Sequence, residues 1–107
     1  MSDSGTRAMT FQARPSDVFA ALQEAARRTG FRYLAGDVNS GTAMFTSGKY
    51  LLMVGEKVHA RWTQVAPGTL QVTLTSAKFG VVGLSGRRGS GVDRLSDELS
   101  GLLPHAG

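Results

Sequence analysis

The stretch Glu56-Lys-Val-His-Ala-Arg-Trp-Thr-Gln-Val-Ala-Pro-Gly-Thr-Leu-Gln-Val-Thr-Leu-Thr75 decides the fold. Apolar and polar residues alternate in both of its halves, and strict alternation predicts strands that are buried on one face only. The turn between the two strands is predicted at Pro67-Gly68. The residues expected to point toward a core are Val58, Ala60, Trp62, Leu70, Val72 and Leu74. The stretch is therefore a hairpin with one face packed and one face in water.

The register of this hairpin follows from the same alternation. A two-residue loop at 67–68 would set Trp62 opposite Thr73, an inward residue beside an outward one. Opposed residues of an antiparallel pair share a face. The connection therefore needs an odd shift, from an odd-length loop or a β-bulge, and we predict that Trp62 lies near Val72.

The flanking sequence supplies the other elements. We expect a strand over Thr6 to Ala13, a helix over 17–29, a hairpin over 31–47 and a last helix from about Gly91 to Leu103. Ser16 is the expected N-cap of the first helix, and Gly30 is its expected stop. Ser90 with Asp93 forms a pair that resembles a capping box for the last helix.

The order β-α-β-β-β-β-α predicts an α+β fold. The middle strands are joined by loops too short for crossovers, so the sheet of about five strands is mostly antiparallel. Both helices then cover one face, which gives a two-layer sandwich. We expect residues 1–5 to be a disordered N-terminus, 6–103 a single domain and 104–107 a tail.

The element order resembles that of TATA-binding-protein-like and helix-grip folds. Small bacterial domains of unknown function are more similar still. They carry a Pro-x-Asp-Val-Phe-x-Ala helix that ends in Gly-Phe, then a turn rich in glycine and basic residues before a last helix. The matching pieces are Pro15-Ser-Asp-Val-Phe-Ala-Ala21, Gly30-Phe31 and Gly86-Arg87-Arg88. The resemblance implies a binding domain: helix-grip proteins hold an apolar ligand between sheet and helix, and TATA-binding proteins grip DNA with their sheet. No diagnostic residue of either group is present.

Composition narrows the class of protein. The chain has no cysteine, which excludes disulfides, thiolate metal sites and cysteine nucleophiles. Its net charge of +4 is scattered rather than clustered. The longest apolar run, residues 50–54, is far shorter than the ~20 residues of a membrane span. We expect a cytoplasmic protein.

That apolar run is also the first candidate site. Tyr50, Leu51, Leu52 and Met53 follow neither a strand nor a helix period. If exposed, they would form a patch of the kind that marks an interface. We predict that they join Trp62 and the last helix in binding an apolar small molecule or a protein partner, including a second copy. The structural alternative is a buried edge strand.

A second candidate site is basic. The segment Gly80–Gly91 is rich in glycine and contains Arg87 and Arg88, just before a predicted helix N-terminus, where anions bind. It matches neither a P-loop nor a dinucleotide fingerprint, and we expect mainly a connector. Arg87 and Arg88, together with Lys57 and Arg61 on the hairpin, are the residues that would bind nucleic acid or phosphate weakly.

The sequence offers no catalytic site. His59 and His105 have no second ligand at metal spacing, and no acid–base pair or nucleophile elbow is present. We therefore predict a non-enzymatic binding module without a cofactor or a metal, and weak electrostatic binding of nucleic acid or phosphate is the alternative.

Overall fold

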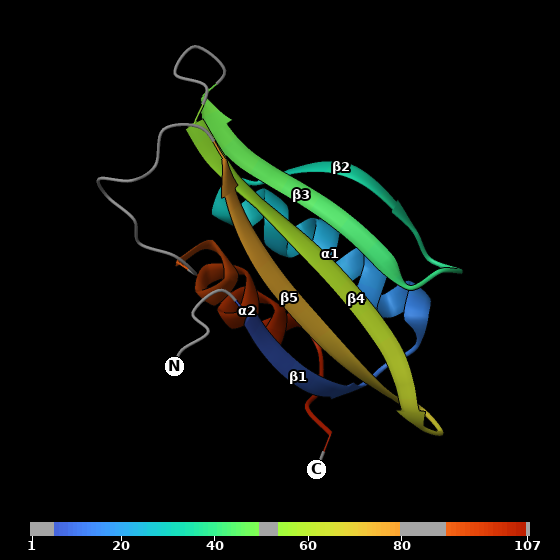
Figure 1. Cartoon of the computed structure of the whole chain (residues 1–107). Helices are drawn as coiled ribbons and strands as arrows, with labels where there is room; N and C mark the ends of the chain where they lie inside the picture. Colours follow the sequence, from blue (N-terminus) through green and yellow to red (C-terminus); the bar gives the residue numbers. More distant parts are fainter. Residues whose placement is uncertain (1–5, 50–53, 80–89, 107) are drawn as a thin grey trace.

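A computed structural model of the chain describes residues 6–49, 54–79 and 90–106. Figure 1 shows a twisted sheet with two helices behind it. The elements are β1 (Thr6–Gln12), α1 (Pro15–Thr29), β2 (Arg32–Asp37), β3 (Thr42–Lys49), β4 (Val54–Ala66), β5 (Thr69–Phe79) and α2 (Ser90–Leu102).

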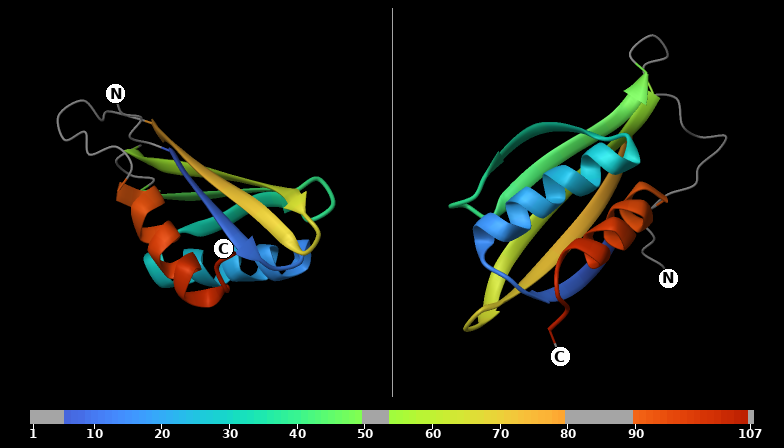
Figure 2. Two further views of the ribbon diagram at one scale, coloured as in Figure 1. Left: turned by 90° about the horizontal axis from the view of Figure 1, so that it is seen from below. Right: turned by 180° about the vertical axis from the view of Figure 1, so that it is seen from behind.

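The described strands form one antiparallel sheet with the order β1-β5-β4-β3-β2. Both helices lie on the same face of this sheet, as the two further views in Figure 2 show. The predicted α+β two-layer architecture and its element order are confirmed. None of the helices in the described ranges is long and apolar enough to cross a membrane.

The pairing of β4 with β5 confirms the predicted register. Trp62 lies opposite Val72, and the register shifts between Gln64 and Ala66. Gly68 takes a φ of 73° in the turn, a left-handed conformation that glycine adopts readily. The shift lets a tight turn connect two strands whose apolar residues still share one face.

The core lies between the sheet and the helices. Each strand of the β4–β5 hairpin buries its alternating apolar residues, and each helix buries one stripe. The fully buried larger side chains are Phe11, Phe45, Leu22, Leu74, Leu95, Leu99, Val18, Val58, Val72 and Val92. Burying such a side chain contributes about 1.5–3 kcal/mol, so this layer supplies most of the driving force for folding.

The start of α1 differs from the sequence expectation. The helix begins at Pro15, and Arg14, not Ser16, is its N-cap. Proline fits the first helical position because its φ is already helical and its missing N–H needs no partner there. Asp17 then accepts a hydrogen bond from the Arg14 backbone N–H at 3.3 Å. The helix ends as predicted, with Gly30 at a φ of 84°.

The start of α2 is packed tightly against the sheet. Ser76 Oγ donates a hydrogen bond to the buried Glu56 carboxylate. A Cβ at Gly91 would lie 2.6 Å from Glu56 Oε1 and 2.6 Å from Phe31 Cζ. The Phe31 ring is itself buried, and the Arg94 guanidinium stacks 5.8 Å from its centre. Glycine at position 91 therefore allows the close approach of helix and sheet.

We predict opposite effects for alanine at the two glycines of α2. Gly91→Ala is expected to lower the free energy of unfolding by about 1–3 kcal/mol, because the new methyl group overpacks a buried site. Gly101→Ala is the matched control: nothing lies within 4 Å of the added Cβ. It is expected to raise stability by up to about 1 kcal/mol, the helix preference of alanine over glycine. Urea unfolding of both variants measures this, and a Gly91→Ala protein at least as stable as the parent would contradict the packing.

Candidate functional site

The structure describes only some of the residues that the sequence grouped as candidates. Tyr50, Leu51, Leu52 and Met53 lie outside the described residues, and so do Arg87 and Arg88. Trp62, Lys57 and Arg61 are described and all lie on β4. Trp62 is buried on the helix-facing side, whereas Lys57 and Arg61 are exposed on the other side.

Trp62 belongs to an aromatic cluster at the turn end of the sheet. Its ring lies 6.0 Å from that of Phe19 on α1, and Phe19 lies 5.9 Å from Tyr33 on β2. The indole Nε1 is buried and has no hydrogen-bond partner among the described residues. Eight positions along β4 separate Trp62 from Val54, about 26 Å of extended strand. Trp62 is thus far from the end of β4 that adjoins residues 50–53.

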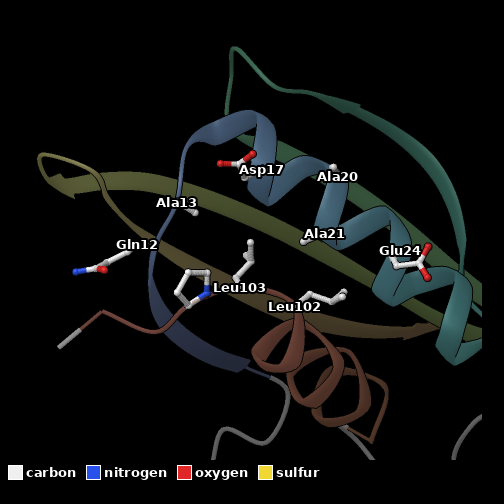
Figure 3. A pocket seen from close by; sticks show the side chains of 9 residues that line it. Gln12, Ala13, Asp17, Ala20, Ala21, Glu24, Leu102 and Leu103 are labelled. Carbon is white, nitrogen blue, oxygen red and sulfur yellow. The ribbon is translucent and has the colours of Figure 1, made fainter.

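A groove between the two helices is a concave site formed by described residues alone. It has a volume of about 460 Å³ and is open to solvent. Figure 3 shows its lining, which comes from the β1–α1 connection, one side of α1 and the C-terminal end of α2. The lining residues are Gln12, Ala13, Asp17, Ala20, Ala21, Glu24, Leu102, Leu103 and Pro104.

The α1 side of the groove follows helical spacing. Asp17, Ala20, Ala21 and Glu24 recur at three and four residues, so they form one stripe along the helix. The two alanines extend no further than a methyl group and leave space beside the neighbouring helix. The two carboxylates stand on either side of this apolar floor. The result is an apolar trough with polar groups toward its ends.

The wall opposite α1 depends on the segment that follows α2. The Gln12 N–H donates to the Pro104 carbonyl at 2.9 Å, and the Ala106 N–H donates to the Thr10 carbonyl at 3.1 Å. The His105 ring packs 5.1 Å from the buried Phe11 ring. These contacts hold Leu103 and Pro104 beside β1, so residues 104–106 form part of the sheet edge and of the groove.

The Glu24 carboxylate of the groove is charged at neutral pH. Hydrogen bonds from Arg27, and next from Arg28, lower the pKa of Glu24 from 4.5 to about 2. Arg28 also reaches Glu98 of α2 at 3.3 Å, so this network links the two helices. Asp17 pairs with Arg14 at 3.3 Å at the other end of the stripe.

The sequence reasoning missed this groove. The sequence feature that corresponds to the groove is a stripe along the first helix. Asp17 and Glu24 stand at its ends, and two adjacent alanines, Ala20 and Ala21, lie between them. In the sequence alone, this stripe is typical of the exposed surface of a helix. Only the position of α2 and of residues 104–106 turns it into a concave site. Within the described ranges, no group of three or more His, Asp or Glu side chains lies close enough together to hold a metal ion.

Comparisons with known proteins show the fold. No family model matches the chain, and none of the curated proteins matches it. Among solved structures, the adenylate sensor from AMP-activated protein kinase complexed with ATP matches with a TM-score of 0.66 at 12% identity, covering 94% of this chain and 98% of that one. Norcoclaurine synthase from Thalictrum flavum matches with a TM-score of 0.57 at 9% identity, covering 91% and 83%. The chain therefore shares a small α+β fold of sheet and helices with these proteins.

The pKa of Glu24 predicts a pH dependence of stability. Because its folded pKa lies below its ordinary value, Glu24 stabilises the fold above about pH 4.5, and this contribution is lost as the pH falls toward about 2. A Glu24→Gln variant lacks the contribution at every pH. Its melting temperature is expected to lie below that of the parent at pH 7 and to approach it near pH 2.

Thermal unfolding by circular dichroism across this pH range measures the difference. High salt is the control, because it screens an exposed ion-pair network and should shrink the gap at pH 7. A gap between parent and variant that stays constant from pH 7 to pH 2 would show that the difference does not come from the charge of Glu24.

Proposed function

We propose that this protein is a non-enzymatic binding module that holds a small, mainly apolar molecule in the groove between α1 and α2. The observation that carries the proposal is the groove itself, with its apolar floor and its polar ends. Its volume of about 460 Å³ falls within the range of ligand pockets, about 300–1,000 Å³. A cytoplasmic location stays a prediction from the sequence.

The polar ends define the chemistry of the ligand. The Asp17 and Glu24 carboxylates accept hydrogen bonds, and the Gln12 amide can donate or accept. These groups favour a ligand that carries a hydrogen-bond donor. The Ala20 and Ala21 methyl groups and the Leu102 side chain would contact its apolar body.

The fold comparisons support the same class of function. The adenylate sensor was solved complexed with ATP, and norcoclaurine synthase was solved in complex with dopamine and hydroxybenzaldehyde. The resemblance to helix-grip folds, which hold apolar ligands between sheet and helix, points the same way. The fold is therefore one on which small-molecule sites are built, although each site depends on its own residues.

Filling the groove tests the proposal. The neutral dye Nile red is expected to bind the parent protein with one-to-one stoichiometry and to fluoresce more strongly. Ala20 is exposed and lines the groove, so Ala20→Trp places an indole ring in the groove. This variant is expected to bind the dye at least tenfold more weakly. Ala21→Leu narrows the floor, with a stability cost of about 1–3 kcal/mol, and is expected to weaken binding as well.

Gln23→Trp is the matched control, because Gln23 is exposed on α1 but does not line the groove. It is expected to bind the dye as the parent does. Equal binding by Ala20→Trp and Gln23→Trp would refute the groove as the site. A dimer that forms in the parent and is lost only in Ala20→Trp would instead assign the groove to a second copy of the chain.

A further inference from the structure

The face of the sheet opposite the helices is not covered by any described element (Figure 2). Its composition follows from the register, because opposed residues share a face. His59 of β4 lies opposite Met44 and Thr75, and Arg61 lies opposite Thr42 and Thr73. The apolar side chains of the same strands face the helices. His59, Arg61 and the residues opposite them therefore lie on the outer surface of the protein.

Three basic side chains lie in a row on this outer surface. Lys57, His59 and Arg61 are all exposed and occupy alternate positions of β4, the central strand. Alternate positions lie about 6.6 Å apart, so the row is about 13 Å long. We call these three residues the basic row.

Most carboxylates of the described structure lie on the helical side: Asp17, Glu24, Asp93, Asp97 and Glu98 are on the helices, and Glu56 faces them from the sheet. Asp37 is on the outer face, at the end of the edge strand β2, where it lies opposite Thr42 and two strands away from Arg61. On the helical side most arginines form ion pairs: Arg7 pairs with Asp93, and Arg27 and Arg28 pair with Glu24. Lys57 and Arg61 form no ion pair with a described carboxylate. The basic row therefore carries two positive charges, on Lys57 and Arg61, that no ion pair among the described residues neutralises.

The neighbours of the basic row suit a phosphate backbone. Thr42, Thr73 and Thr75 flank it with hydroxyl groups, which donate hydrogen bonds to phosphate oxygens. The rings of Phe11, Phe45 and Trp62 are buried on the opposite face of the sheet. Base stacking on aromatic rings normally adds affinity on such sheets, so binding here would rest on contacts to the backbone alone.

We propose that the outer sheet face binds the phosphodiester backbone of single-stranded nucleic acid without sequence preference, through the basic row and the threonines beside it. This function is separate from the groove, which lies on the helical side of the sheet. A flexible single strand can follow the row along β4, whereas a membrane surface would also need exposed apolar side chains to insert. Beside the row, Met44 is half-buried. The exposed apolar side chains Leu34 and Val65 lie away from it, on the edge strand β2 and at the turn end of β4.

Fluorescence anisotropy with labelled oligothymidylate and oligouridylate of about 12 nucleotides tests the proposal, a length within the site sizes of single-strand binders. Both probes are expected to bind at low salt and to dissociate as NaCl rises to physiological strength. The Lys57→Gln/Arg61→Gln double variant is expected to bind at least tenfold more weakly. Its plot of log affinity against log salt is expected to be shallower by about 1.4, for two lost phosphate contacts.

Two further variants separate the basic row from net charge and from folding. Arg14→Gln/Arg27→Gln removes the same charge from exposed positions on the helical side and is expected to keep the parent's salt slope. Lys57→Arg/Arg61→Lys keeps both charges in the row and is expected to bind as the parent does. These results together would support the outer face as the site.

Three results would overturn the proposal. The first is no binding of either oligonucleotide at low salt. The second is an equal loss in the two charge-removing double variants, which would make binding a matter of net charge. The third is equal or tighter binding to phosphatidylglycerol vesicles or to polyglutamate, which would assign the row to a membrane or to an acidic protein.

Discussion

The structure depends on how β4 and β5 pair. A one-residue slip between two strands moves every side chain to the other face of a sheet. In this hairpin, a slip would bury Lys57 and Arg61 and expose Val58 and Trp62. The register shift between Gln64 and Ala66 prevents this, because it places Trp62 opposite Val72 rather than Thr73. The buried core and the charged outer face are thus two results of one pairing.

That pairing also divides the molecule into two chemically different sides. On the helical side, arginines and carboxylates neutralise one another, and small residues of α1 leave a groove. On the outer side, hydroxyl and basic side chains meet water directly. Lys57 and Trp62 are five positions apart on one strand, yet they belong to different surfaces because strand residues alternate in direction. A protein of this size can therefore carry two binding surfaces with no shared residue.

The sequence was a good guide wherever local chemistry decides the structure. The strand alternation, Gly30 as the end of α1 and the odd shift in the β4–β5 hairpin were all predictable. The start of α1 was missed because Ser16 is a good N-cap on its own, whereas Pro15 already fits the first helical position. The groove was not predictable, since Ala20 and Leu103 come together only through packing over 83 positions of the chain. The alternation of β4 puts Glu56 on the inner face, but its close neighbour Gly91 comes from a different element, which the sequence does not show.

The position of β1 has a consequence for the order in which the chain folds. The strands β2 to β5 form a meander of adjacent hairpins, each closed by a short connection. By contrast, β1 pairs with β5, and the nearest partners in that ladder, Gln12 and Thr69, are 57 positions apart. The entropy lost on closing a loop grows with its length, and contacts between distant positions slow folding. The meander is therefore the natural nucleus, and β1 joins it late, bringing α1 with it to cover the core.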